Sequence, residues 1–184
     1  GYFTGTATQL GYQPWYITNT PAQYIASNIS GTNSDWGVYN AIVNGGNASG
    51  LWRTLTADEM RYLISERTDA QQKRSFGTVD DVPGLIILPD TWIKPDGCDY
   101  TGDIVANWTT NVYTAAQWSL MEENGAVFLP MSGYRAAAAA TVAIANGAKY
   151  WTSTFSTGNF AYSLLFKTSS IAPNQTGTAT PDQR

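Results

Sequence analysis

The sequence has no histidine and only one cysteine, Cys98, among its 184 residues. Without histidine, Ser-His-Asp triads, Cys-His dyads and zinc sites ligated by histidine are excluded. A single thiol cannot form an internal disulfide, so the fold must be stabilised by core packing. Cys98 lies between Asp96 and Asp99 rather than beside a basic residue, so we expect no catalytic role for its thiol.

Charged residues are also scarce. The chain has 10 Lys and Arg against 14 Asp and Glu, and its isoelectric point is near 4.6. Ser, Thr and Asn together number 48, twice the charged total, so we expect a surface of neutral hydroxyls and amides. The few basic residues form no stripe. This argues against nucleic acid as a partner, because phosphate neutralisation supplies most of that affinity.

Long apolar runs are missing as well. No apolar run, Leu85–Leu88 included, approaches the roughly 20 residues that span a bilayer, so we expect no membrane insertion. The length predicts one domain over residues 1–184. The chain starts with Gly1 rather than methionine, which we interpret as a segment of a longer protein. Residues 171–184 read as a polar tail without a strand pattern, and residues 1–34 as ordered coil.

Three short helices are predicted from their capping signals. Thr56–Glu59 and Thr114–Gln117 are capping boxes, in which a hydroxyl and a carboxylate or amide satisfy each other's backbone donors. Asp35 can cap a third helix that ends at Val43, and Asn124-Gly125 ends the helix that starts at Thr114. The residues expected to face the core are Met60, Leu63 and Ile64 after the first box, and Trp118 and Met121 after the second.

Short strands are predicted between and after these helices. Because the strands cluster instead of alternating with helices, the pattern indicates the α+β class, with a short antiparallel sheet, two to three helices and long ordered loops. The predicted strands are Leu85–Pro89, Ala126–Pro130, Gly133–Arg135, Lys149–Thr154 and Phe160–Lys167.

Six motifs occur along the chain in a fixed order. They are Ser34–Asn47, Leu51–Glu59, Ile87–Trp92, Asn124–Pro130, Gly133–Arg135 and Lys149–Thr154. Together they resemble a family of surface and phage proteins common in gut bacteria, whose members have the C-type-lectin-like fold in the version shared with formylglycine-generating enzymes. The resemblance extends from about Tyr12 to Phe166.

The resemblance implies a C-type-lectin-like fold and a role in ligand recognition. In this family the C-terminal stretch is often the variable region of a diversity-generating retroelement, which rewrites chosen codons to produce many binding surfaces. The chain departs from its relatives in two places. It shows neither their N-terminal hairpin nor their closing hydrophobic strand with a central arginine, which leaves the terminal strand pairing open. Formylglycine-generating enzymes need paired cysteines, so the single Cys98 argues against that activity.

Acidic residues offer only weak candidates for chemistry. We interpret Asp90, Asp96, Asp99 and Asp103 as solvated turn residues rather than calcium ligands, because their spacing matches no ordered calcium loop. Asp80-Asp81 and Glu122-Glu123 are expected in a turn and on a helix surface, not as converging catalytic carboxylates. We therefore predict no catalytic residue, no metal site and no cofactor. Core packing is expected for most tryptophans, namely Trp36, Trp52, Trp92, Trp108, Trp118 and Trp151.

Residues 136–170 are the candidate variable, ligand-binding region. The run Ala136–Ala145 has helical propensity but no polar face, so we favour surface positions that tolerate many residues over ordinary structural drift. In the strand Phe160–Lys167, alternation predicts that Tyr162, Leu164 and Phe166 face the core and that Ala161, Ser163, Leu165 and Lys167 face the ligand. Phe155 and Phe160 are expected to be exposed aromatic anchors, the alternative being a hairpin whose rings point inward.

The favoured hypothesis is a non-enzymatic recognition domain that binds a protein or glycan on a cell or virion surface, with a possible homo-oligomeric state. An extracellular, cell-surface or phage-virion location is expected. Two alternatives remain open, a structural shell or stalk module of a phage tail or fimbria, and a carbohydrate-binding or carbohydrate-active domain. The predicted ligand-binding residues are Ala137, Ala139, Asn146, Lys149, Phe155, Thr157, Asn159, Phe160, Ser163, Leu165, Lys167, Thr168 and Ser170.

Overall fold

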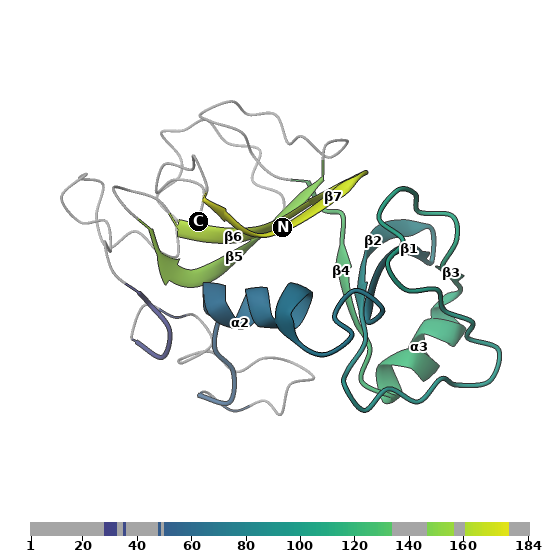
Figure 1. Ribbon diagram of the computed structural model, residues 1–184. Helices are drawn as coiled ribbons and strands as arrows, with labels where there is room; N and C mark the ends of the chain where they lie inside the picture. Colours follow the sequence, from purple (N-terminus) through teal and green to yellow (C-terminus); the bar gives the residue numbers. More distant parts are fainter. Residues whose placement is uncertain are drawn as a thin grey trace, which may run out of the picture.

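The computed structural model describes residues 28–32, 35, 48, 50–133, 147–156 and 161–176. Within these ranges the chain combines short helices with two sheets, which confirms the predicted α+β class (Figure 1). The helical elements are α2 (Ala57–Arg61), its π-helical continuation η3 (Tyr62–Glu66) and α3 (Ala115–Glu123). The strands are β1 (Arg74–Val79), β2 (Val82–Ile87), β3 (Val112–Tyr113), β4 (Val127–Pro130), β5 (Ala148–Phe155), β6 (Ala161–Lys167) and β7 (Ser170–Thr176).

The two sheets lie in separate parts of the molecule. The first has the strand order β3-β1-β2-β4, with β3 parallel to β1 and the other pairs antiparallel. The second, β5-β6-β7, is antiparallel throughout. Figure 1 shows α2 beside the second sheet and α3 beside the first. The sequence predicts one short antiparallel sheet, whereas the described residues form two sheets, and β3 runs parallel to β1 in the first of them.

Helix α2 begins at the predicted capping box. The Thr56 hydroxyl accepts a hydrogen bond from Glu59 N, and the Glu59 carboxylate accepts one from Thr56 N. The helix then widens into a π-helical turn, which ends where Arg67 N donates to Tyr62 O. Met60 and Ile64 are buried, and Leu63 is partly buried against the same core, so the predicted apolar stripe is confirmed.

Helix α3 also begins at a predicted capping box and buries an apolar face. Thr114 and Gln117 form the second predicted capping box, and Trp118 and Met121 are buried beneath the helix. The helix ends at Asn124, and Gly125 adopts a φ of +85°, a conformation that glycine reaches without steric cost. Both capping boxes therefore predicted real helix starts.

Strand β1 is absent from the strands predicted by sequence. It pairs with β2 through a two-residue turn, in which Asp80 and Asp81 have φ values of 47° and 64° and Val79 pairs with Val82. Two consecutive positive φ angles are typical of a type I′ turn. The acidic pair is therefore exposed turn structure, as the sequence predicts, and the turn joins the central strands of the first sheet.

Strand β7 corrects the prediction for the C-terminal end. Residues 170–176 pair with β6 and complete the second sheet, so the prediction of a polar tail without a strand is wrong as far as Thr176. Residues 177–184 lie outside the described residues. Pro173 and the polar side chains that follow it hid the strand, because neither strong β propensity nor alternation marks this segment.

One hydrophobic cluster joins the two sheets. Buried side chains from α2, β1, β2, β5 and β6 meet in it, and Phe76 stacks on Trp108 with ring centroids 4.1 Å apart. A second cluster lies between α3 and the first sheet and contains Trp118 and Cys98. The tryptophan prediction holds for Trp108 and Trp118 and is wrong for Trp52, whose exposed fraction is 49 %.

Candidate ligand-binding surface

The second sheet has one face directed away from Leu164 and Phe166, both of which are fully buried. Side chains alternate along a strand, so Leu165 and Lys167 lie on this opposite face. Strand pairing places Lys149 on one side of Leu165 and Ala172 on the other. We call Lys149, Trp151, Leu165, Lys167 and Ala172 the outer face; Trp151 is included because its position alternates in step with Lys149.

The outer face combines positive charge with an aromatic ring. Lys149 Nζ lies 6.0 Å from the centroid of the Trp151 ring, at the outer limit of a cation–π contact. Partial burial lowers the pKa of Lys149, and the nearby charge of Lys167 lowers it further. The two ammonium groups therefore repel each other, and an acidic group bound between them would be favoured electrostatically.

The turn between β6 and β7 extends this surface into solvent. Lys167 pairs with Ser170 at the end of the hairpin. Lys167, Thr168, Ser169 and Ser170 are all exposed. Three of the predicted ligand-binding residues thus lie together at this turn, with Leu165, half-buried, two residues before Lys167.

Ser163 contradicts the predicted exposure. Its side chain is fully buried, and its hydroxyl donates to Gln175 O on β7 at 3.3 Å. Ser163 pairs with Trp151 on one side and with Gln175 on the other. Ala161, also assigned to the ligand side, is buried too. The alternation of side chains along β6 correctly placed Leu164 and Phe166 in the core. It failed for Ala161 and Ser163 because both faces of β6 are buried at the N-terminal end of the strand.

Phe155 lies at the end of β5 and is half-buried rather than fully exposed. Its backbone N–H donates to Asn28 Oδ1 at 2.9 Å, a contact across 127 positions of the chain. It pairs with Ala161 beyond an irregularity in the β5–β6 register. The remaining predicted residues lie outside the described ranges: Ala137, Ala139, Asn146, Thr157, Asn159 and Phe160.

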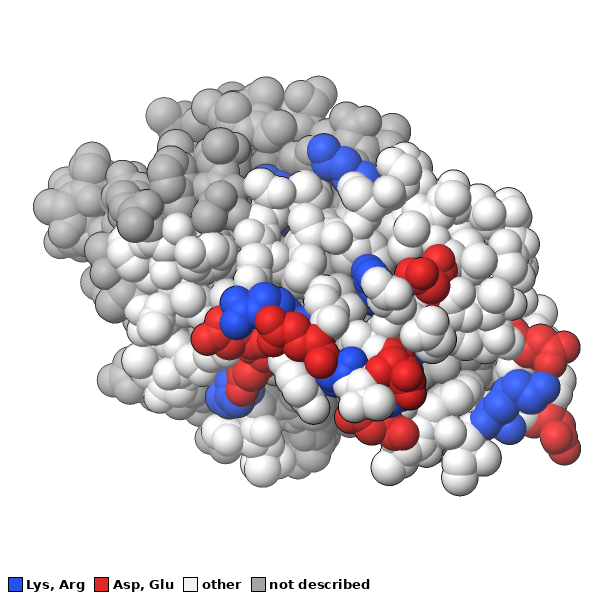
Figure 2. Space-filling view, in the orientation of Figure 1, with Lys and Arg blue, Asp and Glu red and all other residues white. Residues whose placement is uncertain are grey.

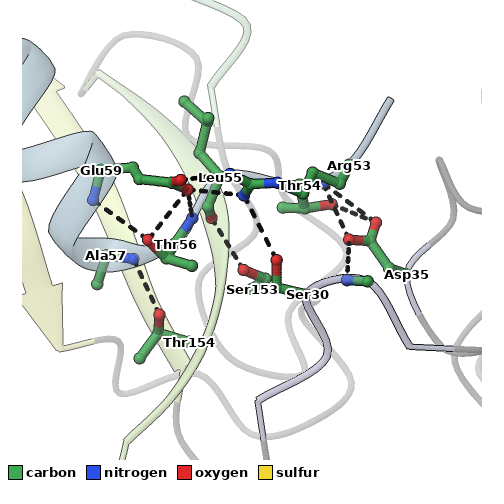
Figure 3. Close-up of polar contacts among 11 residues, drawn as sticks. Ser30, Asp35, Arg53, Thr54, Leu55, Thr56, Ala57, Glu59, Ser153 and Thr154 are labelled. Atoms are coloured by element: carbon green, nitrogen blue, oxygen red, sulfur yellow. Dashed lines mark hydrogen bonds and ion pairs between the residues drawn. The ribbon is translucent and has the colours of Figure 1, made fainter. Parts of the chain in front are cut away.

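A polar junction that sequence reasoning did not predict holds the edge of β5 (Figure 3). Ser153 N and its hydroxyl both donate to Leu55 O, at 2.8 and 3.2 Å. The Asp35 carboxylate, fully buried, accepts hydrogen bonds from Gly31 N and from the backbone and hydroxyl of Thr54. Asp35 was expected to cap a helix reaching Val43, and residues 36–43 lie outside the described residues.

An ion pair completes this junction. The Arg53 guanidinium binds both carboxylate oxygens of Glu59. Arg53 and the backbone N–H of Thr56 hold the pKa of Glu59 at about 2, well below its ordinary value. Since Glu59 also forms the capping box of α2, the junction couples the start of that helix to the segment that runs along β5.

The acidic loop residues are held by basic partners. Asp90 accepts from Lys73 Nζ at 2.9 Å and from Arg67 Nη1 at 3.3 Å, and these cations lower its pKa. Asp99 pairs with Lys94 at 2.6 Å. Among the described residues, no three His, Cys, Asp or Glu side chains come together as a metal site. Figure 2 shows most of the visible acidic side chains beside basic ones, with uncharged surface between these groups.

Cys98 is fully buried, and its thiol lies 3.6 Å from Gln117 O. No helix in the described ranges is both long and apolar enough to cross a bilayer. Comparison with known proteins found no matching family model, no matching curated protein and no matching solved structure.

Proposed function

We propose that this protein is a non-enzymatic recognition domain that binds a protein or glycan ligand through the outer face and the β6–β7 turn. The observation that carries the proposal is the row of Lys149, Leu165 and Ala172 across three strands, continued by exposed Lys167 and Ser170. Such a surface offers charge, apolar area and hydroxyls on a rigid sheet, a combination suited to binding.

The composition of this surface favours a ligand with acidic groups. Lys149 and Lys167 are close enough for the charge of one to affect the other. Trp151 and Leu165 supply apolar contact area beside them. A sialylated or uronic-acid-containing glycan, or an acidic protein loop, would match this chemistry.

The resemblance to C-type-lectin-like surface proteins supports the same proposal. In those proteins the C-terminal stretch often carries the variable positions, and here that stretch includes β5, β6 and the turn to β7. We propose that the chain has this fold and that exposed positions such as Thr168 and Ser170 are diversified. The buried Ser163 is not part of the proposed surface.

The proposal is tested with an array of acidic and neutral glycans and with extracts of cell-surface proteins. Wild type is compared with the double variant Lys149→Glu/Lys167→Glu and with the control Lys94→Glu, which reverses a charge in the first-sheet region. We expect binding to be lost only in the double variant. Equal binding by all three proteins would contradict the proposal, provided that circular dichroism shows them equally folded.

One observation favours the alternative structural role. Leu51, Trp52 and Leu55 are exposed by 61 %, 49 % and 37 % and follow one another along one segment beside β5. A shell or stalk module would bury such residues against sister subunits. Sedimentation of the purified protein tests this alternative: a stable oligomer that Leu51→Ser/Leu55→Ser dissociates supports it, and a monomer at micromolar concentration argues against it.

A further inference from the structure

Strand register places the five residues of the outer face relative to one another. Lys149, Leu165 and Ala172 form one row across β5, β6 and β7. Lys167 follows Leu165 by two residues on β6, and Trp151 follows Lys149 by two residues on β5. Because β5 and β6 are antiparallel, Lys167 and Trp151 lie on opposite sides of this row. The row therefore has a second cation on one side and an aromatic ring on the other.

The two lysines of the outer face are diagonal neighbours across β5 and β6. Residues in this relation lie roughly 7–8 Å apart. A Cβ added to Gly147, just before β5, would lie 3.0 Å from Lys167 Cγ, so the Lys167 side chain leans towards the strand of Lys149. Lys167 is exposed and forms no ion pair within the described part of the chain. A carboxylate that contacts both ammonium groups would relieve their repulsion.

An aromatic ring adjoins this pair of cations. Lys149 Nζ lies 6.0 Å from the centroid of the Trp151 ring, so one small ligand can contact both. Trp151 and Leu165 are each partly exposed. The face of an indole ring is electron-rich and attracts groups with a slight positive charge. The C–H groups on one side of a sugar ring are such groups.

Small side chains occupy the β7 side of the outer face. Ala172 lies beside Leu165, and Ser170 lies beside Lys167 at the end of the hairpin. The hydroxyls of Ser170 and of Thr168 in the adjoining turn belong to exposed residues. Hydroxyls both donate and accept hydrogen bonds, as the hydroxyls of a sugar do. A flat polar ligand can therefore lie across the row and reach these groups.

The dimensions of the outer face match a small ligand. Strands β5 and β7 are two strand spacings apart, roughly 10 Å. The step from Lys167 to the row of Trp151 covers four residues of β6, roughly 13 Å. The face therefore extends over on the order of 130 Å², whereas each partner in a specific protein–protein interface contributes roughly 800 Å². These five residues match the extent of one or two sugar rings and only a fraction of a protein interface.

We propose that the outer face is a binding site for a carboxylated sugar, such as a uronic or sialic acid residue of a glycan. The sugar ring packs on Trp151 and Leu165. Its carboxylate is bound between Lys149 and Lys167. This inference rests on the proposed function and narrows the ligand from a protein or glycan to an acidic saccharide. An acidic protein loop offers the same charge but lacks the C–H face that contacts the indole ring.

The experiment is an NMR titration of the whole chain with three probes. Methyl glucuronide carries the carboxylate, methyl glucoside is its neutral counterpart, and a tetra-aspartate peptide carries charge without a sugar ring. We expect the glucuronide to bind at least about 10-fold more tightly than the glucoside, as for a gained hydrogen bond between charged groups. We also expect it to bind more tightly than the peptide. Saturation transfer from the protein should reach the C–H protons of the sugar ring.

Two kinds of variant separate the ring from the charges. Trp151→Ala should weaken glucuronide binding about 10-fold and leave the peptide almost unaffected. Lys167→Met keeps the apolar stem at an exposed position and should reduce the affinity for the glucuronide to that for the glucoside, whereas Lys167→Arg should preserve the preference. The control Trp52→Ala removes an exposed ring outside the outer face and should change no affinity.

Equal affinities for glucuronide and glucoside would overturn the inference. So would a peptide that binds as tightly as the glucuronide, with Trp151→Ala without effect. If neither sugar binds but Lys149→Glu/Lys167→Glu loses a protein ligand from the extracts, the acidic-sugar site is wrong and the proposed function stands. If that double variant keeps every ligand, the proposed function fails as well. The Lys167 variants decide the question even if Trp151→Ala folds poorly.

Discussion

The backbone N–H of Ala57 donates to the Thr154 hydroxyl at 2.9 Å and joins the first turn of α2 to strand β5, 97 residues further along the chain. The first N–H groups of a helix have no partner within the helix itself. Here a side chain from the second sheet supplies one. This bond, with the capping box of Thr56, fixes α2 against the sheet that carries the proposed ligand-binding surface.

Replacing Thr154 tests this connection. Thr154→Val keeps the shape of the side chain but removes the acceptor, leaving the N–H of Ala57 unsatisfied. We expect the free energy of unfolding to fall by about 1–2 kcal/mol, as measured by urea denaturation. Thr154→Ser retains the hydroxyl and should lose less than half as much. Equal losses in the two variants would show that packing of the methyl group, rather than the hydrogen bond, is important.

The Asp80-Asp81 turn offers a stabilising substitution. Both residues have positive φ, a conformation that Asn-Gly adopts more readily than Asp-Asp. The double variant Asp80→Asn/Asp81→Gly should therefore raise the stability of the protein by about 0.5–1 kcal/mol. The control Asp81→Val places a β-branched residue at positive φ and should lower it. A less stable Asn-Gly variant would contradict the assignment of a type I′ turn.

Glu59 should make stability depend on pH. Its pKa is about 2 in the folded protein, held down by Arg53 and Thr56, against an ordinary value of 4.5. The group therefore stabilises the fold above pH 4.5, and this contribution is lost as the pH falls from about 4.5 to about 2. Glu59→Gln should lower the thermal unfolding midpoint at pH 6, and the difference from wild type should shrink towards pH 2.

A second carboxamide variant controls for nonspecific effects of charge. Glu123 is exposed at the end of α3 and forms no ion pair within the described residues. Glu123→Gln should therefore change the midpoint little across the same pH range. If Glu59→Gln and wild type differ by the same amount at pH 6 and pH 2, the ion pair with Arg53 does not contribute in solution.

Local signals in the sequence predicted the starts of both α2 and α3. The capping boxes at Thr56 and Thr114 depend on residues three positions apart, so a short window contains all the information needed. The apolar residues that follow each box then identified the buried face. In the same way, Asn124-Gly125 marked the end of α3, because a positive φ favours glycine.

Pairing between distant segments could not be predicted in this way. Strand β1 is paired on both sides and contains Gly77, where a Cβ would lie 2.6 Å from Asn111 O, so its sequence lacks a regular strand pattern. Strand β7 is polar and interrupted by Pro173. Ser163 shows the same limit for the candidate site, since alternation assigns a residue to one face of a strand but does not reveal whether that face is buried at that position.

Amide hydrogen exchange of the protein, with and without the tightest ligand from the binding screen, locates the binding surface. We expect slower exchange on binding in residues 165–170, which contain Leu165, Lys167 and the β6–β7 turn, with little change in β1 and β2. Slower exchange confined to the first sheet or to residues 51–55, with the β6–β7 turn unchanged, would contradict this expectation.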